Sequence, residues 1–449
     1  MNKLFLGLGI TLVVLLALVG VLLYIMYMYN PALLNGMVDA RYPLELVSEN
    51  LVKTQNEFTL SFWYYVEGWK YKYNEKKTLL NWDDGKLMVE FRPKDNSMVI
   101  IMKDLNGWIN EGQIMMAQRE KKIKRAKSWK FDTVATHGLY DLQQALSSHS
   151  GSIMEPVYMS PAQAYSDCNE MEAALSYQIP TWCYSRIANP STYFLEETIA
   201  LLETYGSDII ASGLATSSGM SAIKTATDPF LVKDDKLPPP NIVSCAKVYG
   251  GTFQQFWIRR YQEQGIEVRW ICDPGNLDEW LSKIDNGTRF VYGEFPSNPS
   301  LTIFDIESVA ELAHSFSIPL IVDSTCATPA ITRPLLFGAD IVVHSASKAI
   351  SSSGTSIAGL IVARKNIISK IGPDEMKADF ASWAKLWPFR DNGPSIHPMA
   401  AIMTLNDMRS LRMMVDKMSQ SALQIAEYLH NHPKIETTFQ EASQHHLEI

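Results

Sequence analysis

From Phe131 onward, short apolar runs alternate with segments of helical periodicity. Runs of this kind are typical of strands buried on both faces, and strands joined through helices pair in parallel. We therefore expect an α/β fold with a mostly parallel sheet covered by helices on both faces. The expected strands are residues 241–245, 267–271, 290–294, 319–323, 340–344 and 359–363. The expected helices are residues 192–204, 219–227, 252–264, 277–284 and 305–316, with one long helical stretch from about 398 to 430.

Two of these strands end in side chains that bear chemistry. Asp323 ends one strand and is followed by Thr325, while Ser345, Ser347 and Lys348 follow the next. Ligands of open α/β sheets bind at the carboxyl ends of the strands. An amine, a carboxylate and hydroxyls at those ends are what pyridoxal phosphate (PLP) requires: the amine binds it covalently, the carboxylate keeps the pyridine nitrogen protonated and the hydroxyls hold the phosphate. An exposed lysine after a strand is the plain alternative for Lys348 taken alone.

Further segments occur in the order and approximate spacing of one enzyme family. They are residues 182–190 (WCYSRIANP), 217–222 (SSGMSA), 249–252 (YGGT), 294–299 (EFPSNP), 323–325 (DST) and 345–348 (SASK). From about Phe131 to its end the chain thus resembles the Cys/Met-metabolism, or trans-sulfuration, PLP enzymes. These include cystathionine γ-synthase, O-acetylhomoserine sulfhydrylase and the cystathionine and methionine γ-lyases. The resemblance implies an aspartate aminotransferase-like transferase fold (fold type I) with PLP as cofactor.

The resemblance also implies a role for each residue around the cofactor ring. Lys348 would carry the cofactor and move protons at the substrate α and β carbons. Asp323 would pair with the pyridine nitrogen, and Tyr249 would stack on the ring and assist proton transfer. Asn298 would bond near the phenolic oxygen, although a turn residue before Pro299 is the plain alternative.

A second group of residues is expected around the phosphate. Helix N-termini favour anions, so the start of the helix at 219 would meet the phosphate through main-chain N–H groups. Tyr184 and Arg186 would reach the phosphate of a neighbouring subunit, which implies a homodimer or homotetramer; a role in pinning a surface loop is the alternative. The remaining expected contacts are Ser218, Gly219, Met220, Ser345, Ser347 and Thr325, where Gly219 has a packing role as its alternative and Thr325 a role in orienting Asp323.

The chain departs from the family pattern in two ways. Ala349–Gly354 replaces the aromatic residue and Gly-His pair that many members carry, and Gly251 stands where methionine γ-lyases carry a reactive cysteine, which disfavours that activity. Only 101 residues follow Lys348, and the family's arginine for the substrate carboxylate lies later still. We therefore expect a C-terminally truncated enzyme joined to an N-terminal fragment of another protein class.

The N-terminal region has a different character. Residues 4–29 are uncharged and mostly apolar, which is long enough to span a bilayer, so a transmembrane anchor with the enzyme on the cytoplasmic side is expected. Residues 31–118 alternate in the strand manner and loosely resemble part of a laminin-G/concanavalin-like sandwich.

Residues 119–130 carry seven Lys/Arg against one Glu. This composition predicts a basic linker or helix start, or alternatively a surface for anionic lipid. The expected domains are residues 1–30, 31–118, 119–130, 131–190 (an N-terminal arm), 191–380 (the PLP-binding domain) and 381–449 (a truncated small domain).

Composition excludes several other classes of protein. The net charge of −8 argues against a nucleic-acid partner. The five cysteines are odd in number and form no CxxC pair, so they predict reduced, buried thiols rather than a disulfide framework or a zinc site. Cys326 is expected to be an inert thiol and His344 is given no role.

These residues favour one function and leave two alternatives. The leading hypothesis is γ-replacement on an activated homoserine ester with a thiol or sulfide, as in methionine biosynthesis. The second is a γ-lyase that uses the same residues for elimination. The third is a membrane-anchored binding protein that retains a non-catalytic PLP-type fold.

Overall fold

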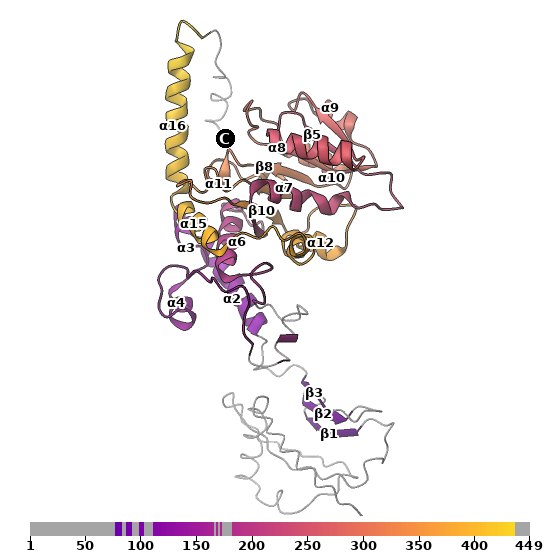
Figure 1. Cartoon of the computed structure of the whole chain (residues 1–449), viewed down its shortest axis with the longest axis vertical. Coiled ribbons are helices and arrows are strands. Elements are labelled where there is room, and N and C mark those ends of the chain that lie inside the picture. The colour runs from indigo at the N-terminus through magenta and orange to yellow at the C-terminus, as the bar shows by residue number, and fades with distance from the viewer. Residues whose placement is uncertain are drawn as a thin grey trace, which may run out of the picture. The chain divides into compact units, whose positions relative to one another are not determined.

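The computed structural model describes residues 77–82, 87–91, 98–102, 111–165, 168, 171–172 and 182–435. The chain forms two compact units, Met1–Ile114 and Met115–Ile449, and each is described by itself (Figure 1). The expected membrane-spanning segment, residues 4–29, lies outside the described residues. Within the described ranges, no helix is long and apolar enough to cross a membrane.

The first unit contains a three-stranded antiparallel sheet in the order β1-β2-β3. Its strands are β1 (Lys77–Trp82), β2 (Leu87–Phe91) and β3 (Met98–Met102). Leu87 pairs with Met102 at one end of the β2–β3 ladder, and Phe91 pairs with Met98 at the other. Strands β2 and β3 lie within residues 31–118, where the sequence alternates in the strand manner, and they pair antiparallel.

The second unit is built on a seven-stranded sheet in the order β4-β10-β9-β8-β7-β5-β6. Strands β6, β5, β7, β8 and β9 are parallel, whereas β10 runs antiparallel to both β9 and β4. The expected α/β class with a mostly parallel sheet is confirmed. The strands are β4 (Ala211–Thr216), β5 (Asn241–Cys245), β6 (Glu267–Ile271), β7 (Thr288–Glu294), β8 (Leu320–Asp323), β9 (Ile341–His344) and β10 (Gly359–Arg364).

Helices cover both faces of this sheet, as expected (Figure 1). Successive strand residues point to opposite faces: Ile341 and Val343 of β9 pack into one core, and Val342 packs into the other. The first core also contains apolar residues of α7 and α10, and the second contains those of α6 and α15. The helices of the N-terminal half are α2 (Glu111–Ala126), α3 (Phe131–His137), α4 (Leu142–Ser148), α6 (Pro190–Glu203), α7 (Gly219–Thr227), η2 (Asp228–Leu231), α8 (Gly250–Gln254), the π-helix η3 (Gln255–Glu263) and α9 (Leu277–Lys283). Those that follow are α10 (Ile306–Ser315), α11 (Thr328–Ile331), η4 (Pro334–Phe337), α12 (Asp374–Ala378), α13 (Phe380–Ala384), η5 (Lys385–Phe389), α14 (Arg390–Asn392), α15 (Pro398–Met408) and α16 (Leu411–His430).

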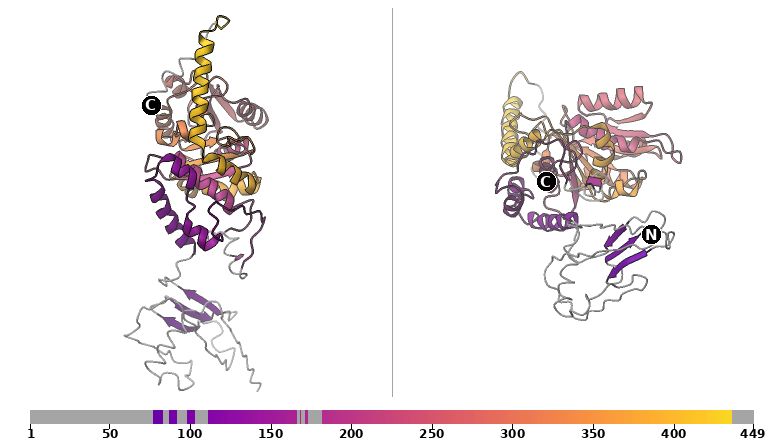
Figure 2. Two further views of the ribbon diagram at one scale, coloured as in Figure 1. Left: turned by 90° about the vertical axis from the view of Figure 1, so that its left-hand side faces the viewer. Right: turned by 60° about the horizontal axis from the view of Figure 1, so that its bottom comes forward.

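The prediction of one long helical stretch from about residue 398 to 430 is wrong. The structure has two helices, α15 and α16, separated at Arg409 and Ser410. The N–H groups of these two residues donate to the carbonyls three residues back, at 3.3 Å and 3.1 Å, which tightens the chain into a turn. Beyond that turn α16 runs as one straight helix past the rest of the unit (Figure 2).

The basic stretch at residues 119–130 belongs to the second unit and packs against it. It lies in the end of α2 and the turn that follows. The Arg119 guanidinium makes two 2.9 Å hydrogen bonds with the Glu197 carboxylate of α6. Lys127 donates to the carbonyls of Ser207 and Ile209, each at 3.0 Å. These contacts attach the C-terminal half of α2 to α6 and to the segment that follows α6.

Candidate active site

Three neighbouring parallel strands end together at one edge of the large sheet. Glu294 of β7 lies in register with Asp323 of β8, and Asp323 lies in register with Val343 of β9. Lys348 lies on the loop that follows β9, and its side chain is exposed. The sheet order therefore brings the expected carboxylate and the expected amine to the same edge.

Asp323 is a buried carboxylate with one well-satisfied oxygen. Its Oδ1 accepts hydrogen bonds from the N–H and the hydroxyl of Thr325, at 3.0 Å and 2.6 Å. Among the described residues, Oδ2 meets only the Tyr292 hydroxyl, at a long 3.5 Å. Burial raises the pKa of Asp323, and the two bonds from Thr325 oppose that rise. Oδ2, a buried carboxylate oxygen with only this one long contact, is suited to accept from a cationic donor such as a protonated pyridine nitrogen.

Thr325 also ties two strand ends together. Its hydroxyl oxygen accepts from the Ser345 N–H at 2.7 Å, while its proton goes to Asp323. The structure thus gives Thr325 the orienting role that was its alternative, and the same contact places Ser345 beside the end of β8.

The start of α7 lies against the same loop. Ser218 and Ser221 form a capping box, with the Ser221 N–H bonded to the Ser218 hydroxyl at 3.2 Å and the Ser218 N–H to the Ser221 hydroxyl at 2.9 Å. The N–H groups of Gly219 and Met220 open the helix and have no intrahelical acceptor. A Cβ on Gly219 would lie 2.6 Å from Ser345 Cβ, so the helix start touches the loop that leads to Lys348. Free N–H groups at a helix start, beside a serine hydroxyl, suit a phosphate.

Ser347 has its hydroxyl occupied within the chain. The hydroxyl donates to the Ala358 carbonyl at 3.1 Å and accepts from the Ala358 N–H at 2.9 Å. These bonds fasten the Lys348 loop to the start of β10. The predicted phosphate bond from Ser347 would require this hydroxyl to change partner.

Tyr249 and Asn298 are brought together through Glu294. Both side chains are exposed, and they follow different strands, β5 and β7. The Tyr249 N–H donates to Glu294 Oε1 at 2.6 Å, and the Asn298 N–H donates to Glu294 Oε2 at 3.1 Å. Glu294 was missed by the sequence reasoning, although it opens the EFPSNP segment that was singled out.

Tyr184 and Arg186 lie on the exposed loop before α6. The Arg186 guanidinium sits 5.4 Å from the centre of the Tyr184 ring and donates to the Arg390 carbonyl. Within the chain these contacts are those of a surface loop. Their expected place at the phosphate of a neighbouring subunit stays a prediction.

A second pair of buried titratable residues lies next to this site. The His344 ring Nε2 and Glu203 Oε1 are 2.7 Å apart, and both side chains are fully buried. Their other polar atoms, His344 Nδ1 and Glu203 Oε2, have no hydrogen-bond partner among the described residues. His344 lies close enough to Asp323 to oppose, in part, the rise in the Asp323 pKa that burial causes. His344, which the sequence left without a role, thus has a buried partner from α6.

The cysteines differ in part from expectation. Cys183 and Cys245 are buried free thiols, but Cys168, Cys272 and Cys326 are exposed. The expectation that all five are buried is wrong, because Cys326 follows β8 on an open loop rather than within the sheet. Desolvation and the nearby carboxylates raise the pKa of the Cys326 thiol, which keeps it protonated and unreactive. Across the described ranges no group of His, Cys, Asp and Glu is arranged to hold a metal ion.

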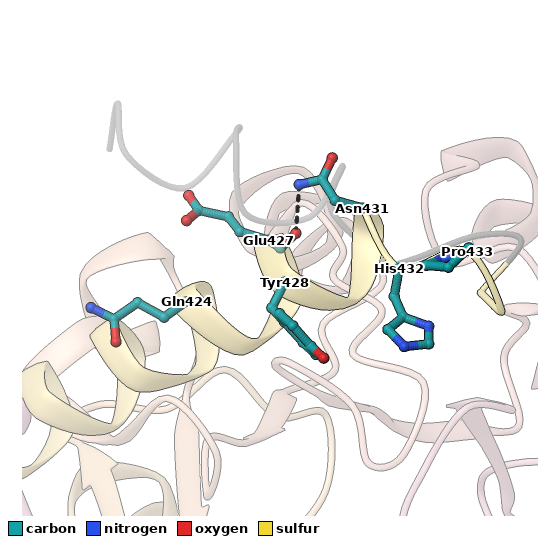
Figure 3. Close-up of a pocket in the computed structure, with 6 residues that line it drawn as sticks. All are labelled: Gln424, Glu427, Tyr428, Asn431, His432 and Pro433. Carbon is teal, nitrogen blue, oxygen red and sulfur yellow. Dashed lines mark hydrogen bonds between the residues drawn. The ribbon is translucent and has the colours of Figure 1, made fainter.

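A hollow near the end of α16 shares no residue with this constellation (Figure 3). Its lining residues lie on the last turns of the helix and just beyond it, where the Asn431 amide donates to the Glu427 carbonyl at 2.8 Å. It is lined by Gln424, Glu427, Tyr428, Asn431, His432 and Pro433. The candidate active site is therefore the strand-end edge, and not this hollow.

Known proteins match the second unit. The family model for Cys/Met metabolism PLP-dependent enzymes matches residues 133–448. The chain is 32% identical over 330 residues to homocysteine synthase of Schizosaccharomyces pombe, covering 68% of this chain and 72% of the relative. It is 31% identical over 317 residues to L-methionine gamma-lyase of Fusobacterium nucleatum subsp. polymorphum, covering 70% and 72%. A putative O-acetylhomoserine (thiol)-lyase of Campylobacter jejuni, solved with N'-pyridoxyl-lysine-5'-monophosphate, superposes with a TM-score of 0.60 at 27% identity, covering 70% of this chain and 80% of that one.

The fold and the strand-end residues define a PLP-dependent enzyme of fold type I. The chain belongs to the Cys/Met metabolism PLP-dependent enzyme family, and its cofactor is pyridoxal phosphate. The family and cofactor expected from the sequence are confirmed. The family model begins at residue 133, so it gives no support to the laminin-G likeness of residues 31–118.

Proposed function

We propose that this chain catalyses γ-replacement on an activated homoserine ester, with a thiol or sulfide as the incoming group. The observation that carries this choice within the family is at Gly251. A Cβ there would lie 2.6 Å from Tyr249 Cε1 and 3.0 Å from Met220 Sδ. No cysteine side chain fits beside Tyr249 without moving that ring. The site therefore lacks the thiol of the methionine γ-lyase pattern, and a thiol at this position would require the Tyr249 ring to shift.

The residues at the strand ends have the chemistry this reaction needs. The bound cofactor supplies an electron sink that acidifies the protons on the substrate α and β carbons. The Lys348 amine moves those protons, and Asp323 holds the opposing charge at the pyridine nitrogen. Tyr249, at the start of α8, covers the ring. The ester oxygen then leaves the γ carbon, and the thiol sulfur bonds to that carbon.

Elimination is the second candidate, because L-methionine gamma-lyase is among the similar relatives. Elimination uses the same lysine, carboxylate and tyrosine and differs in its last steps. There the γ substituent leaves without an incoming thiol, and water releases a keto acid and ammonia. Product analysis separates the two reactions.

The first experiment tests the cofactor site. Purified chain is mixed with PLP, and its visible spectrum is recorded before and after borohydride for the wild type, Lys348→Ala and Lys233→Ala. Lys233 is an exposed control lysine, with 85% of its side chain accessible. A visible band that borohydride removes is expected in the wild type and Lys233→Ala and not in Lys348→Ala. Absence of the band in all three would favour the non-catalytic alternative.

The second experiment tests the reaction. O-acetylhomoserine is supplied with and without sulfide, and homocysteine, acetate, 2-oxobutanoate and ammonia are measured. Replacement predicts homocysteine and acetate in equal amounts, and only when sulfide is present. Release of 2-oxobutanoate and ammonia as the main products, with sulfide present, would instead identify an eliminating enzyme.

A further inference from the structure

We propose that Glu294 is a positioning residue that holds the main chains of Tyr249 and Asn298 in place around the cofactor ring. The proposal rests on the proposed function, since that function gives Tyr249 and Asn298 their places at the ring. Glu294 itself contacts the ring-binding residues through their main chains and has been given no role so far.

The geometry joins three segments at one carboxylate. Glu294 ends β7 and is only 4% exposed. Its Oε1 accepts from the Tyr249 N–H, 45 residues away in sequence, and its Oε2 accepts from the Asn298 N–H. The Thr252 hydroxyl adds a longer contact to Oε1, at 3.4 Å. One side chain thus sets the separation between the loop after β5 and the loop after β7.

The burial of Glu294 beside a second carboxylate argues against a purely structural role. Glu294 lies in register beside Asp323, so two carboxylates are buried next to each other at the strand ends. Burial and the negative charge of Asp323 raise the pKa of Glu294 to about 8. Burying two neighbouring carboxylates costs folding free energy, because each disfavours the charged form of the other. Such pairs are concentrated at functional sites. Within the described part of the chain, Tyr292 of the same strand, Cys245 of β5 and Cys326 after β8 lie close enough to Glu294 for its charge to raise their pKa values.

Glu279 makes the same pattern of hydrogen bonds at a position away from the candidate active site. It accepts the N–H groups of Cys272 and Asp273, one on each carboxylate oxygen, both at 2.8 Å. It is partly exposed, and these bonds lower its pKa, the reverse of Glu294. Glu279 is therefore a matched control for a carboxylate that accepts two main-chain N–H groups.

The substitution Glu294→Gln separates positioning from folding. A glutamine keeps the shape but has one carbonyl oxygen, so one of the two N–H groups faces an NH₂ group and loses its acceptor. Tyr249 or Asn298 must then shift. We expect the dissociation constant for PLP to rise about tenfold, as for the loss of one buried hydrogen bond. We also expect the visible circular dichroism per bound cofactor to fall, since that signal reports how the ring is held.

The experiment compares the wild-type chain, Glu294→Gln, Glu294→Asp and Glu279→Gln, each titrated with PLP. Glu294→Asp retains both carboxyl oxygens but is one methylene too short to reach both N–H groups, so positioning predicts that it is impaired like Glu294→Gln. Glu279→Gln should keep wild-type affinity and dichroism. Wild-type affinity and dichroism in either folded Glu294 variant would overturn the inference. Failure of the wild type to form its Lys348-dependent band would instead overturn the proposed function.

Discussion

The contact between α7 and the Lys348 loop makes Gly219→Ala an informative substitution. An added Cβ would lie 2.6 Å from Ser345 Cβ, 2.9 Å from Ser345 Cα and 3.0 Å from Ser345 Oγ. Carbon atoms normally approach to about 3.5 Å, so the two segments must separate by roughly 0.9 Å. One of the three atoms belongs to the main chain, and a change of the serine rotamer therefore does not relieve the clash.

The expected cost has two parts. Overpacking of this size destabilises a folded protein by about 1–3 kcal/mol. The same shift moves the free N–H groups of the helix start away from the expected phosphate position. Loss of one hydrogen bond to a charged group is about 1.5–3 kcal/mol, so PLP affinity should fall roughly 10- to 100-fold.

Two measurements test the Gly219→Ala variant. Urea unfolding without cofactor gives the change in stability, and titration of the visible band gives PLP affinity. Gly250→Ala is the control, because it also lies at a helix start and nothing lies within 4 Å of its added Cβ. Its stability should stay within about 0.5 kcal/mol of wild type. If Gly219→Ala unfolds at the wild-type urea concentration and binds PLP with wild-type affinity, the assigned contact is wrong.

Two further predictions concern buried titratable groups. Glu203→Ala leaves the fully buried His344 ring without its 2.7 Å partner, so the free energy of unfolding should fall by about 3 kcal/mol in urea denaturation; a loss below 0.5 kcal/mol would contradict the pairing. Glu294 has a folded-state pKa of about 8, above the ordinary glutamate value, so the folded state binds an extra proton between these two pKa values and stability falls as the pH rises through that window. Wild type should therefore lose stability relative to Glu294→Gln between pH 5.5 and 8, and parallel curves for the two proteins would refute this.

Local sequence was informative where a strand is apolar and a helix is short. The run Asn241–Cys245 and the helix Gly219–Thr227 have the bounds that the pattern predicts. Strand β4 was missed because four of the six residues of ASGLAT are Ala, Ser or Gly, which give only a weak strand signal. Its place at the sheet edge comes from pairing with β10, far along the chain.

The break between α15 and α16 was also missed because it depends on contacts between residues far apart in the sequence. Helical periodicity continues through Arg409, and nothing local ends it. In the structure the Asp407 carboxylate accepts from the hydroxyls of Ser351 and Ser353, at 2.9 Å and 2.5 Å, which anchors the end of α15 to the Lys348 loop. The turn that follows therefore depends on hydrogen bonds between residues that are 56 and 54 positions apart in the sequence.

By itself the sequence determined the α/β class, the family and the chemistry at two strand ends, Lys348 and Asp323. These follow from residue type, apolar periodicity and motif order, which are local properties. Only the tertiary structure decided that Glu294 faces Asp323 and binds Tyr249 and Asn298, and that His344 is paired with Glu203. Strand order and side-chain partners depend on contacts between distant residues, and no local pattern specifies them.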